Sequence, residues 1–186
     1  PGEDLYTERV LQCWGIDGHN SHTNVCSAGA RAGYAFWMGM DRPNPDHEKT
    51  RFTLMLSSHL EAGHYFTPHA ERIIDAKMVG AKSAVIDTRL SNTAAKSDYW
   101  LAPHPGTEPG LLLAIANQLI QHGSVNRTFL ERWTNWSELM EDREYLGYLH
   151  DQGLVPAVPE GRTFENFMEL LRDLYAGYTL EWAEEE

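Results

Sequence analysis

Short apolar runs alternate with amphipathic segments in the middle of the chain. The runs at residues 52–57 and 82–88 have the length of buried strands, and a helical pattern lies between them from Pro68 to Val79. Gly80 follows this pattern as a C-terminal stop. A strand, a helix of about a dozen residues and a second strand predict a right-handed crossover and a parallel strand pair.

The pattern continues with a third predicted strand at residues 98–102 and a strongly apolar helix at residues 110–122, which Gly123 ends. Further helices are expected near residues 126–132, 137–150 and 164–175. The predicted fold is α/β: a three-layer αβα arrangement with a mainly parallel, Rossmann-like dinucleotide-binding sheet and a helical C-terminal part.

The first 25 residues are rich in turn formers and histidine and are interpreted as a loop, followed by a helix at about residues 28–38. We therefore divide the chain into a loop-rich segment 1–26, an α/β segment 27–135 and a helical segment 136–186. The sequence has no obvious initiator, and we expect it to be part of a longer, multi-domain protein.

Composition narrows the range of partners. The 186 residues carry 15 basic and 27 acidic side chains, a formal net charge of −12, which argues against nucleic acid or an anionic membrane as partner. No apolar run is long enough to cross a bilayer, so direct membrane insertion is not expected. Cys13 and Cys26 are too few for a disulfide framework or for an iron–sulfur cluster, which takes about four thiolates.

Three loops follow the predicted strands at their carboxyl ends, where open α/β sheets bind ligands. Their residue types suit a nucleotide, because hydroxyls and backbone N–H groups bind phosphate, carboxylates accept hydrogen bonds from ribose or guanine, and arginine pairs with phosphate. The loops cover residues 57–64, 87–93 and 105–108.

Each loop also has an ordinary structural interpretation. Asp87 and Thr88 can cap the turn at residues 92–95, Thr107 is a good N-cap, and Arg89 can be a solvated or salt-bridged side chain. Three such loops on one sheet edge favour the nucleotide site.

Cys26 stands just before the predicted helix at residues 28–38, where free backbone N–H groups favour a thiolate. A thiolate there can bind a soft metal or attack an electrophile, and a buried structural cysteine is the alternative. The spacing of His59, Glu61, His64 and His69 does not match the usual zinc patterns.

Four motifs, in order over about residues 20–135, resemble the dimethyl sulfoxide reductase family of molybdenum and tungsten enzymes. Asn24–Ser27 with Gly33 looks like the family's metal-ligand loop, and Leu56–His64 looks like its loop after the next strand. Gly80–Arg89 is similar to its GAK-hydrophobic-DPR element, and Thr93–Asp98 through Pro105–Glu108 is similar to its TA…AD…PGTD element.

This resemblance implies a role for particular residues toward a bis(molybdopterin guanine dinucleotide) cofactor. Cys26 would ligate molybdenum or tungsten and would be the catalytic metal ligand. Four residues of the first loop would contact one pterin guanine dinucleotide: Ser57, Ser58, His59 and Glu61. The others would hold the nucleotide end of the cofactor: Asp87, Thr88, Arg89, Ser91, Gly106, Thr107 and Glu108.

The sequence departs from the family pattern at several positions. His59 replaces the usual asparagine, Thr88 the proline of the DPR element and Glu108 the common aspartate. Ser27 follows the cysteine where the family's formate dehydrogenases carry histidine, which argues against formate as substrate.

The resemblance implies a segment of the catalytic subunit of an oxidoreductase that moves an oxygen atom, hydride or electrons. The family's [4Fe–4S] motif would lie upstream of this segment, and the isolated chain is expected to be inactive and free of cofactor. A small redox substrate and an electron-transfer subunit, iron–sulfur or other, are the implied partners. The compartment, cytoplasmic or exported, stays open.

Three alternatives remain from the sequence. The chain can be a non-catalytic nucleotide-binding module, a non-redox family member such as a hydratase, or a hydrolase with Cys26 as nucleophile and His22 or His64 as base.

Overall fold

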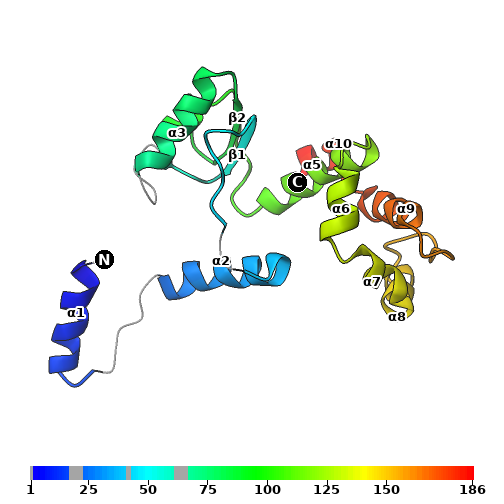
Figure 1. The fold of residues 1–186 in the computed structure, drawn as a ribbon, viewed down its shortest axis with the longest axis horizontal. Coiled ribbons are helices and arrows are strands. Elements are labelled where there is room, and N and C mark those ends of the chain that lie inside the picture. Colours follow the sequence, from blue (N-terminus) through cyan, green and yellow to red (C-terminus); the bar gives the residue numbers. More distant parts are fainter. Residues whose placement is uncertain (1, 17–22, 41–42, 61–66) are drawn as a thin grey trace. The chain divides into compact units, whose positions relative to one another are not determined.

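The computed structural model describes residues 2–16, 23–40, 43–60 and 67–186. These residues form two compact units, Pro1–His47 and Glu48–Glu186. The two units are described separately. The predicted α/β fold is confirmed in the second unit (Figure 1).

The first unit consists of helices α1 (Gly2–Cys13) and α2 (Thr23–Met38). The prediction of a loop over the first 25 residues is wrong for α1, because the good helix formers from Leu5 onward outweigh Gly2 and Asp4, and the cluster of turn formers that prompted the prediction begins at Gly15. Gly15 has a φ of 77°, the left-handed region that glycine adopts without steric cost. Helix α2 also begins five residues before the predicted start at residue 28.

The sheet of the second unit is built as predicted. Strands β1 (Phe52–Leu56) and β2 (Lys82–Ile86) are parallel and are joined through helix α3 (Thr67–Met78). Strand β3 (Tyr99–Leu101) follows the short helix α4 (Asn92–Ala95) and pairs in parallel with β2, giving the order β1-β2-β3.

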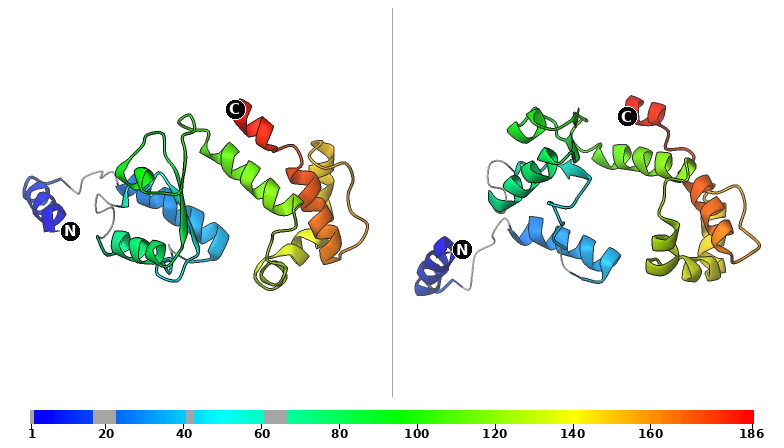
Figure 2. Two further views of the ribbon diagram at one scale, coloured as in Figure 1. Left: turned by 90° about the horizontal axis from the view of Figure 1, so that it is seen from above. Right: turned by 45° about the horizontal axis from the view of Figure 1, so that its top comes forward.

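One face of the sheet packs against helices, and on the other face Ala84 and Ile86 of the central strand are buried while the outer strands are exposed. Met55 of β1 and the fully buried Val85 of β2 form a core with Ile73 of α3 and Ala94 of α4. Figure 2 shows α3 running alongside the strands. The strands alternate their side chains, so the opposite face carries the exposed apolar residues Phe52, Leu54, Leu56, Tyr99 and Leu101.

An ion-paired cluster fixes the amino-terminal edge of the sheet. Asp98, just before β3, accepts hydrogen bonds from Lys77 Nζ (2.8 Å), Lys82 Nζ (2.8 Å) and the Ser83 backbone N–H (2.9 Å). These donors hold the pKa of Asp98 well below its ordinary value, and the Asp98 carboxylate in turn raises the pKa of Lys82. The cluster connects α3, β2 and the start of β3.

The rest of the second unit is helical and begins with α5 (Glu108–Gln121), which packs against α9 (Phe164–Tyr175) and α10 (Leu180–Glu185). Between them lie α6 (Arg127–Trp133), α7 (Trp136–Glu141) and α8 (Arg143–Asp151). The single helix predicted at residues 137–150 is two helices, because Asp142 has a non-helical ψ of 81° and caps α8 through a hydrogen bond from the Tyr145 N–H. Helix α10 was not predicted from its acidic sequence, and Thr179 caps it.

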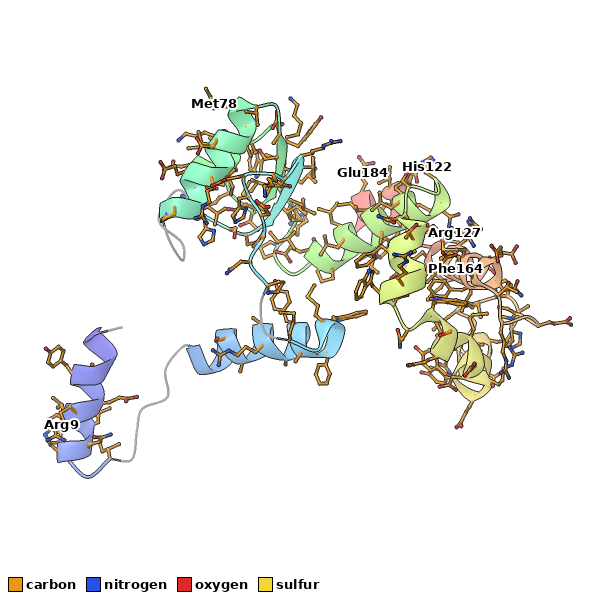
Figure 3. All side chains as sticks on the ribbon, viewed as in Figure 1. Arg9, Met78, His122, Arg127, Phe164 and Glu184 are labelled. Atoms are coloured by element: carbon orange, nitrogen blue, oxygen red, sulfur yellow. The ribbon has the colours of Figure 1, made fainter. Side chains whose placement is uncertain are left out.

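This helical part has its own apolar core. Met140 and Leu146 are fully buried among residues of α9 and the α8–α9 connection. Trp136 meets Phe164 edge to face at 5.3 Å, and the guanidinium of Arg127 lies 4.7 Å above the Phe164 ring (Figure 3). Arg127 also pairs with Glu165 and Glu131, so the cation is held over the edge of the core.

Among the residues that the structure describes, no helix combines the length and the apolar character needed to cross a bilayer.

Replacing Leu146 by alanine is expected to lower the free energy of unfolding by about 2–5 kcal/mol, because it leaves a cavity at a fully buried position. Urea unfolding of the chain, followed by far-UV circular dichroism, measures the change. The matched control is Leu154→Ala, where the side chain is 45% exposed and the expected change is within about 0.5 kcal/mol. Equal losses in both variants would show that Leu146 does not lie in a packed core.

Replacing Asp98 by asparagine is expected to lower stability at neutral pH and to flatten its dependence on acid. Because folding lowers the pKa of Asp98, its stabilisation is complete above the ordinary carboxyl value of 3.8 and disappears as the pH falls through the lower folded value. The midpoint of thermal unfolding between pH 7 and pH 2 measures this. The matched control is Asp151→Asn, on an exposed side chain. An acid dependence as steep in Asp98→Asn as in the wild type would contradict the assignment.

Candidate functional site

The strands end in register, which places the loops that follow them at one edge of the sheet. Leu56, Ile86 and Leu101 are paired side by side across the three strands. The ladder continues one step further, since the Ser57 N–H donates to the Ile86 carbonyl (2.8 Å) and the Asp87 N–H to the Leu101 carbonyl (3.1 Å). The first two predicted nucleotide loops therefore start next to one another, while the third, at residues 105–108, begins four residues beyond the end of β3.

The first loop begins with a strained residue. Ser57 has a φ of 50°, in the left-handed region that residues other than glycine rarely adopt. The Ser57 side chain is exposed, while Ser58 and His59 are half-buried. The predicted contact Glu61 and the histidine His64 lie outside the described residues.

The second loop is held by Asp87 and Ser91. Asp87 Oδ1 accepts from the Arg89 backbone N–H (3.2 Å), and its carbonyl accepts from Trp100 Nε1 (2.8 Å). Ser91 is buried and caps α4 by accepting from the Ala94 N–H (3.2 Å). The cap is thus Ser91 and not Asp87 or Thr88, which leaves the exposed Thr88 hydroxyl at the surface of the edge.

The third loop, after β3, is closed on itself. Glu108 Oε2 accepts from the Gly106 N–H (3.0 Å), and the Thr107 hydroxyl donates to the His104 carbonyl (2.9 Å). Thr107 holds the N-cap position of α5, but its side chain makes no capping hydrogen bond. Within the described residues, hydrogen bonds of Gly106, Thr107 and Glu108 stay inside this loop and its helix.

A contact between His59 and Arg89 joins the first two loops. Arg89 Nη2 lies 3.4 Å from His59 Nδ1, and the other ring nitrogen, His59 Nε2, is buried without a hydrogen-bond partner. A buried polar atom left without a partner costs about 1–3 kcal/mol. The sequence indicated both residues separately, but nothing in it indicated that they touch.

Cys26 belongs to the other unit. It is the fourth residue of α2 and lies inside the first helical turn, not before the helix as predicted. This position keeps it among the free N–H groups of the helix start, and no acidic residue occupies the first turn of α2. His22 lies outside the described residues. Within the described part of the chain, no group of three histidine, cysteine, aspartate or glutamate side chains is arranged to hold a metal ion.

No family model matches the sequence of the chain. Comparison with curated proteins nevertheless finds similar sequences. The chain is 38% identical over 94 residues to a putative catalytic subunit of dimethyl sulfoxide reductase from Halobacterium salinarum, covering 50% of this chain and 11% of the relative. It is 30% identical over 118 residues to the molybdopterin-containing subunit of thiosulfate reductase from Salmonella typhimurium, covering 63% of this chain and 15% of the relative.

Its homologues are molybdopterin-containing catalytic subunits of the dimethyl sulfoxide reductase family. The solved structure of acetylene hydratase from Pelobacter acetylenicus has the same fold over 97% of this chain and 20% of that protein, with a TM-score of 0.65 and 18% sequence identity. The chain aligns with only part of each of these proteins, and it spans 11–15% of the two curated relatives described above.

Replacing Ser57 by glycine is expected to raise the free energy of unfolding by up to about 1 kcal/mol, because glycine adopts a positive φ without the strain that a Cβ causes. Urea unfolding of the chain measures this. Ser58→Gly is the matched control: the positive φ belongs to Ser57, so glycine at Ser58 is expected to lower stability. A similar loss in both variants would show that the backbone at Ser57 carries no strain.

Proposed function

We propose that this chain is a segment of the catalytic subunit of a molybdenum or tungsten oxidoreductase and binds part of a bis(molybdopterin guanine dinucleotide) cofactor. The observation that carries the proposal is the register of the sheet, which brings the motifs after β1, β2 and β3 to one edge. The names of the relatives supply the chemistry, since they include a sulfite dehydrogenase subunit and the molybdopterin-containing subunit of a thiosulfate reductase.

The residues at this edge fit a phosphate-bearing dinucleotide. His59 Nε2 is a buried polar atom without a partner, and the exposed Arg89 side chain lies beside it. The Ser57 and Ser58 hydroxyls begin the same loop, to which Glu61 also belongs, and Thr88 is exposed at the start of the next. A hydroxyl-rich edge with a cation binds phosphate and sugar oxygens.

The nucleotide end of the cofactor would lie against the second and third loops. The carboxylates of Asp87 and Glu108 each receive one backbone N–H of their own loop, which orients them and leaves acceptor capacity for ribose hydroxyls or a guanine edge. Ser91 supports the second loop by capping α4, so we assign it a supporting role beside its predicted contact. Gly106, with a φ of 94°, and Thr107 form the turn into α5.

Cys26 would ligate the metal from the first turn of α2. The helix start favours the thiolate, which is the form that binds a soft metal. When bound, such a metal supplies two-electron exchange with the substrate, and its thiolate ligand adjusts the electronic properties of the metal. Cys26 does not attack the substrate in this proposal.

The fold does not by itself choose redox chemistry, because a protein named as a hydratase shares it. The oxidoreductase assignment therefore comes from the curated relatives. Redox turnover requires an electron donor or acceptor, so an electron-transfer subunit, iron–sulfur or other, is the proposed partner, together with a small redox substrate. A [4Fe–4S] cluster in the longer protein is part of the same proposal.

The test is elemental and nucleotide analysis of the full-length protein that contains this chain, made in a host that builds the cofactor. We expect molybdenum or tungsten in about equimolar amount and about two guanine nucleotides per chain after acid release. Cys26→Ser is expected to abolish turnover and to change the electron paramagnetic resonance signal of the metal, because an oxygen ligand replaces sulfur.

Cys13→Ser is the matched control, because Cys13 is an exposed cysteine in α1 of the same unit. This control is expected to keep turnover, metal content and the metal signal. A wild-type protein without either metal would contradict the proposal and would favour a non-catalytic nucleotide-binding module. An unchanged metal signal in Cys26→Ser would contradict the ligand assignment alone.

A further inference from the structure

Helix α5 presents one face to the C-terminal part of the chain. Gly110, Ala114, Asn117 and Gln121 follow one another at intervals of four, three and four residues, which places them on the same side of the helix. Ala114 is fully buried and Asn117 is 3% exposed. Helices α9 and α10 pack against α5, and Figure 1 shows α10 beside it. This face is therefore where the chain from α9 to α10 is held.

Two hydrogen bonds attach the face to distant backbone. Asn117 Nδ2 donates to the Tyr178 carbonyl, 61 positions later (2.9 Å), and Gln121 Nε2 donates to the Arg172 carbonyl, 51 positions later (2.9 Å). Asn117 Oδ1 is buried and has no hydrogen-bond partner among the described residues. Because burial of an amide is costly, the bond to Tyr178 fixes where along α5 the segment leading to α10 lies.

The beginning of α5 is held by a tryptophan of α10. The Trp182 N–H donates to the hydroxyl of Thr179, the N-cap of α10 (3.1 Å), and the Trp182 ring meets Tyr178 edge to face at 5.2 Å. A Cβ added to Gly110 would stand 3.3 Å from Trp182 Cη2 and 3.6 Å from Cζ3. The shorter distance is less than the usual carbon–carbon separation of about 3.5–4.0 Å, so the ring fits here without displacement only because residue 110 has no side chain.

Gly110 is connected to the third loop through the first bonds of α5. The Gly110 N–H donates to the Thr107 carbonyl (3.0 Å), and Glu108 accepts from the Gly106 N–H (3.0 Å). Thr107 makes no side-chain capping bond, so the helix lacks the hydrogen bond that usually fixes its first turn. The Trp182 ring packs on this uncapped turn from α10.

We propose that Trp182 is a positioning residue for the third loop: by packing on Gly110 it holds the uncapped start of α5, and with it the loop at residues 105–108, in one conformation. Trp182 acts through Gly110 and does not contact the ligand. Under the proposed function, on which the ligand part of this inference rests, the loop is thereby preorganised for the guanosine end of the cofactor, with the Glu108 carboxylate already oriented.

Burial of Trp182 also stabilises the helical part as a whole, so a loss of stability alone does not test this role. The two contributions differ in where they act. Global unfolding exposes every amide alike, whereas a loosened helix start exposes only the amides of the loop and the first turn. Hydrogen exchange at the Gly106 N–H, compared with that at the N–H of the buried Leu170 in α9, separates them.

The first measurement is residue-resolved amide hydrogen exchange of the 186-residue chain by NMR. Trp182→Phe keeps an aromatic ring beside Tyr178 but ends short of Gly110, because Cη2 and Cζ3 lie at the far end of the indole. We expect exchange at Gly106 to become about tenfold faster in this variant, while exchange at Leu170 changes less than about twofold. Equal acceleration at both amides would show a loss of global stability only and would overturn the positioning role.

A second substitution tests the contact itself. Gly110→Ala is expected to displace the Trp182 ring and to accelerate exchange at Gly106, although alanine is the better helix former. Combining Gly110→Ala with Trp182→Phe is expected to bring exchange at Gly106 back to within about threefold of the wild type, because the added methyl group fills the space that the shorter ring leaves. Additive acceleration in the combined variant would contradict a contact through position 110.

Gly147→Ala in α8 is the matched control. A Cβ at Gly147 would meet no atom within 4 Å, whereas at Gly110 it meets the tryptophan. The control is therefore expected to raise the Tm by about 2–4 °C through helix propensity. It should leave exchange at Gly106 unchanged.

The full-length protein, made in a host that builds the cofactor, separates this inference from the proposed function. If the loop is held for the cofactor, Trp182→Phe loses guanine nucleotide during dialysis faster than the wild type, and the combined variant retains it. If the full-length protein contains no guanine nucleotide, the proposed function fails, while local acceleration at Gly106 in the chain still supports the positioning of the loop. If the cofactor is present and Trp182→Phe and Gly110→Ala both retain it as the wild type does, the proposed function stands and the positioning role is wrong.

Discussion

The parallel ladder of β1, β2 and β3 is the constraint on which the site depends. Its register aligns Leu56, Ile86 and Leu101, so that loops distant in sequence begin at adjacent points of one edge. A shift of one residue would turn Met55 and Val85 away from α3 and expose them, which the buried core forbids. Burial of apolar side chains on one face therefore fixes the positions of polar groups at the edge.

The two edges of the sheet differ in how their charges are satisfied. At the amino-terminal edge, Asp98 is fully engaged by two lysines and a backbone N–H, which anchors β3 to β2 and α3. At the carboxyl edge, Arg89 has no carboxylate partner among the described residues, and His59 Nε2 has none of any kind. The amino-terminal edge thus stabilises the sheet, while the carboxyl edge, where open α/β sheets bind ligands, keeps donors without a protein partner.

The helices of the second unit are stabilised separately from the sheet. Their core is formed by aromatic and aliphatic residues of α7, α8 and α9, with Arg127 covering Phe164. Cys26 lies in the first unit, at the start of a helix that is described by itself. The proposed metal ligand and the proposed nucleotide edge are thus carried by different compact units of one chain.

The sequence by itself determined the elements of the sheet, the stops at Gly80 and Gly123 and the set of loop residues, because these follow from local periodicity and turn chemistry. It missed α1 and α10, whose helix formers carry little apolar periodicity, and the break at Asp142. The cap of α4 by Ser91 is a local contact between residues three apart, which the interpretation of the sequence assigned to Asp87 and Thr88 instead. Only the tertiary structure decided that His59 meets Arg89, because that contact depends on strand register and side-chain direction across 30 positions of sequence, which no local pattern encodes.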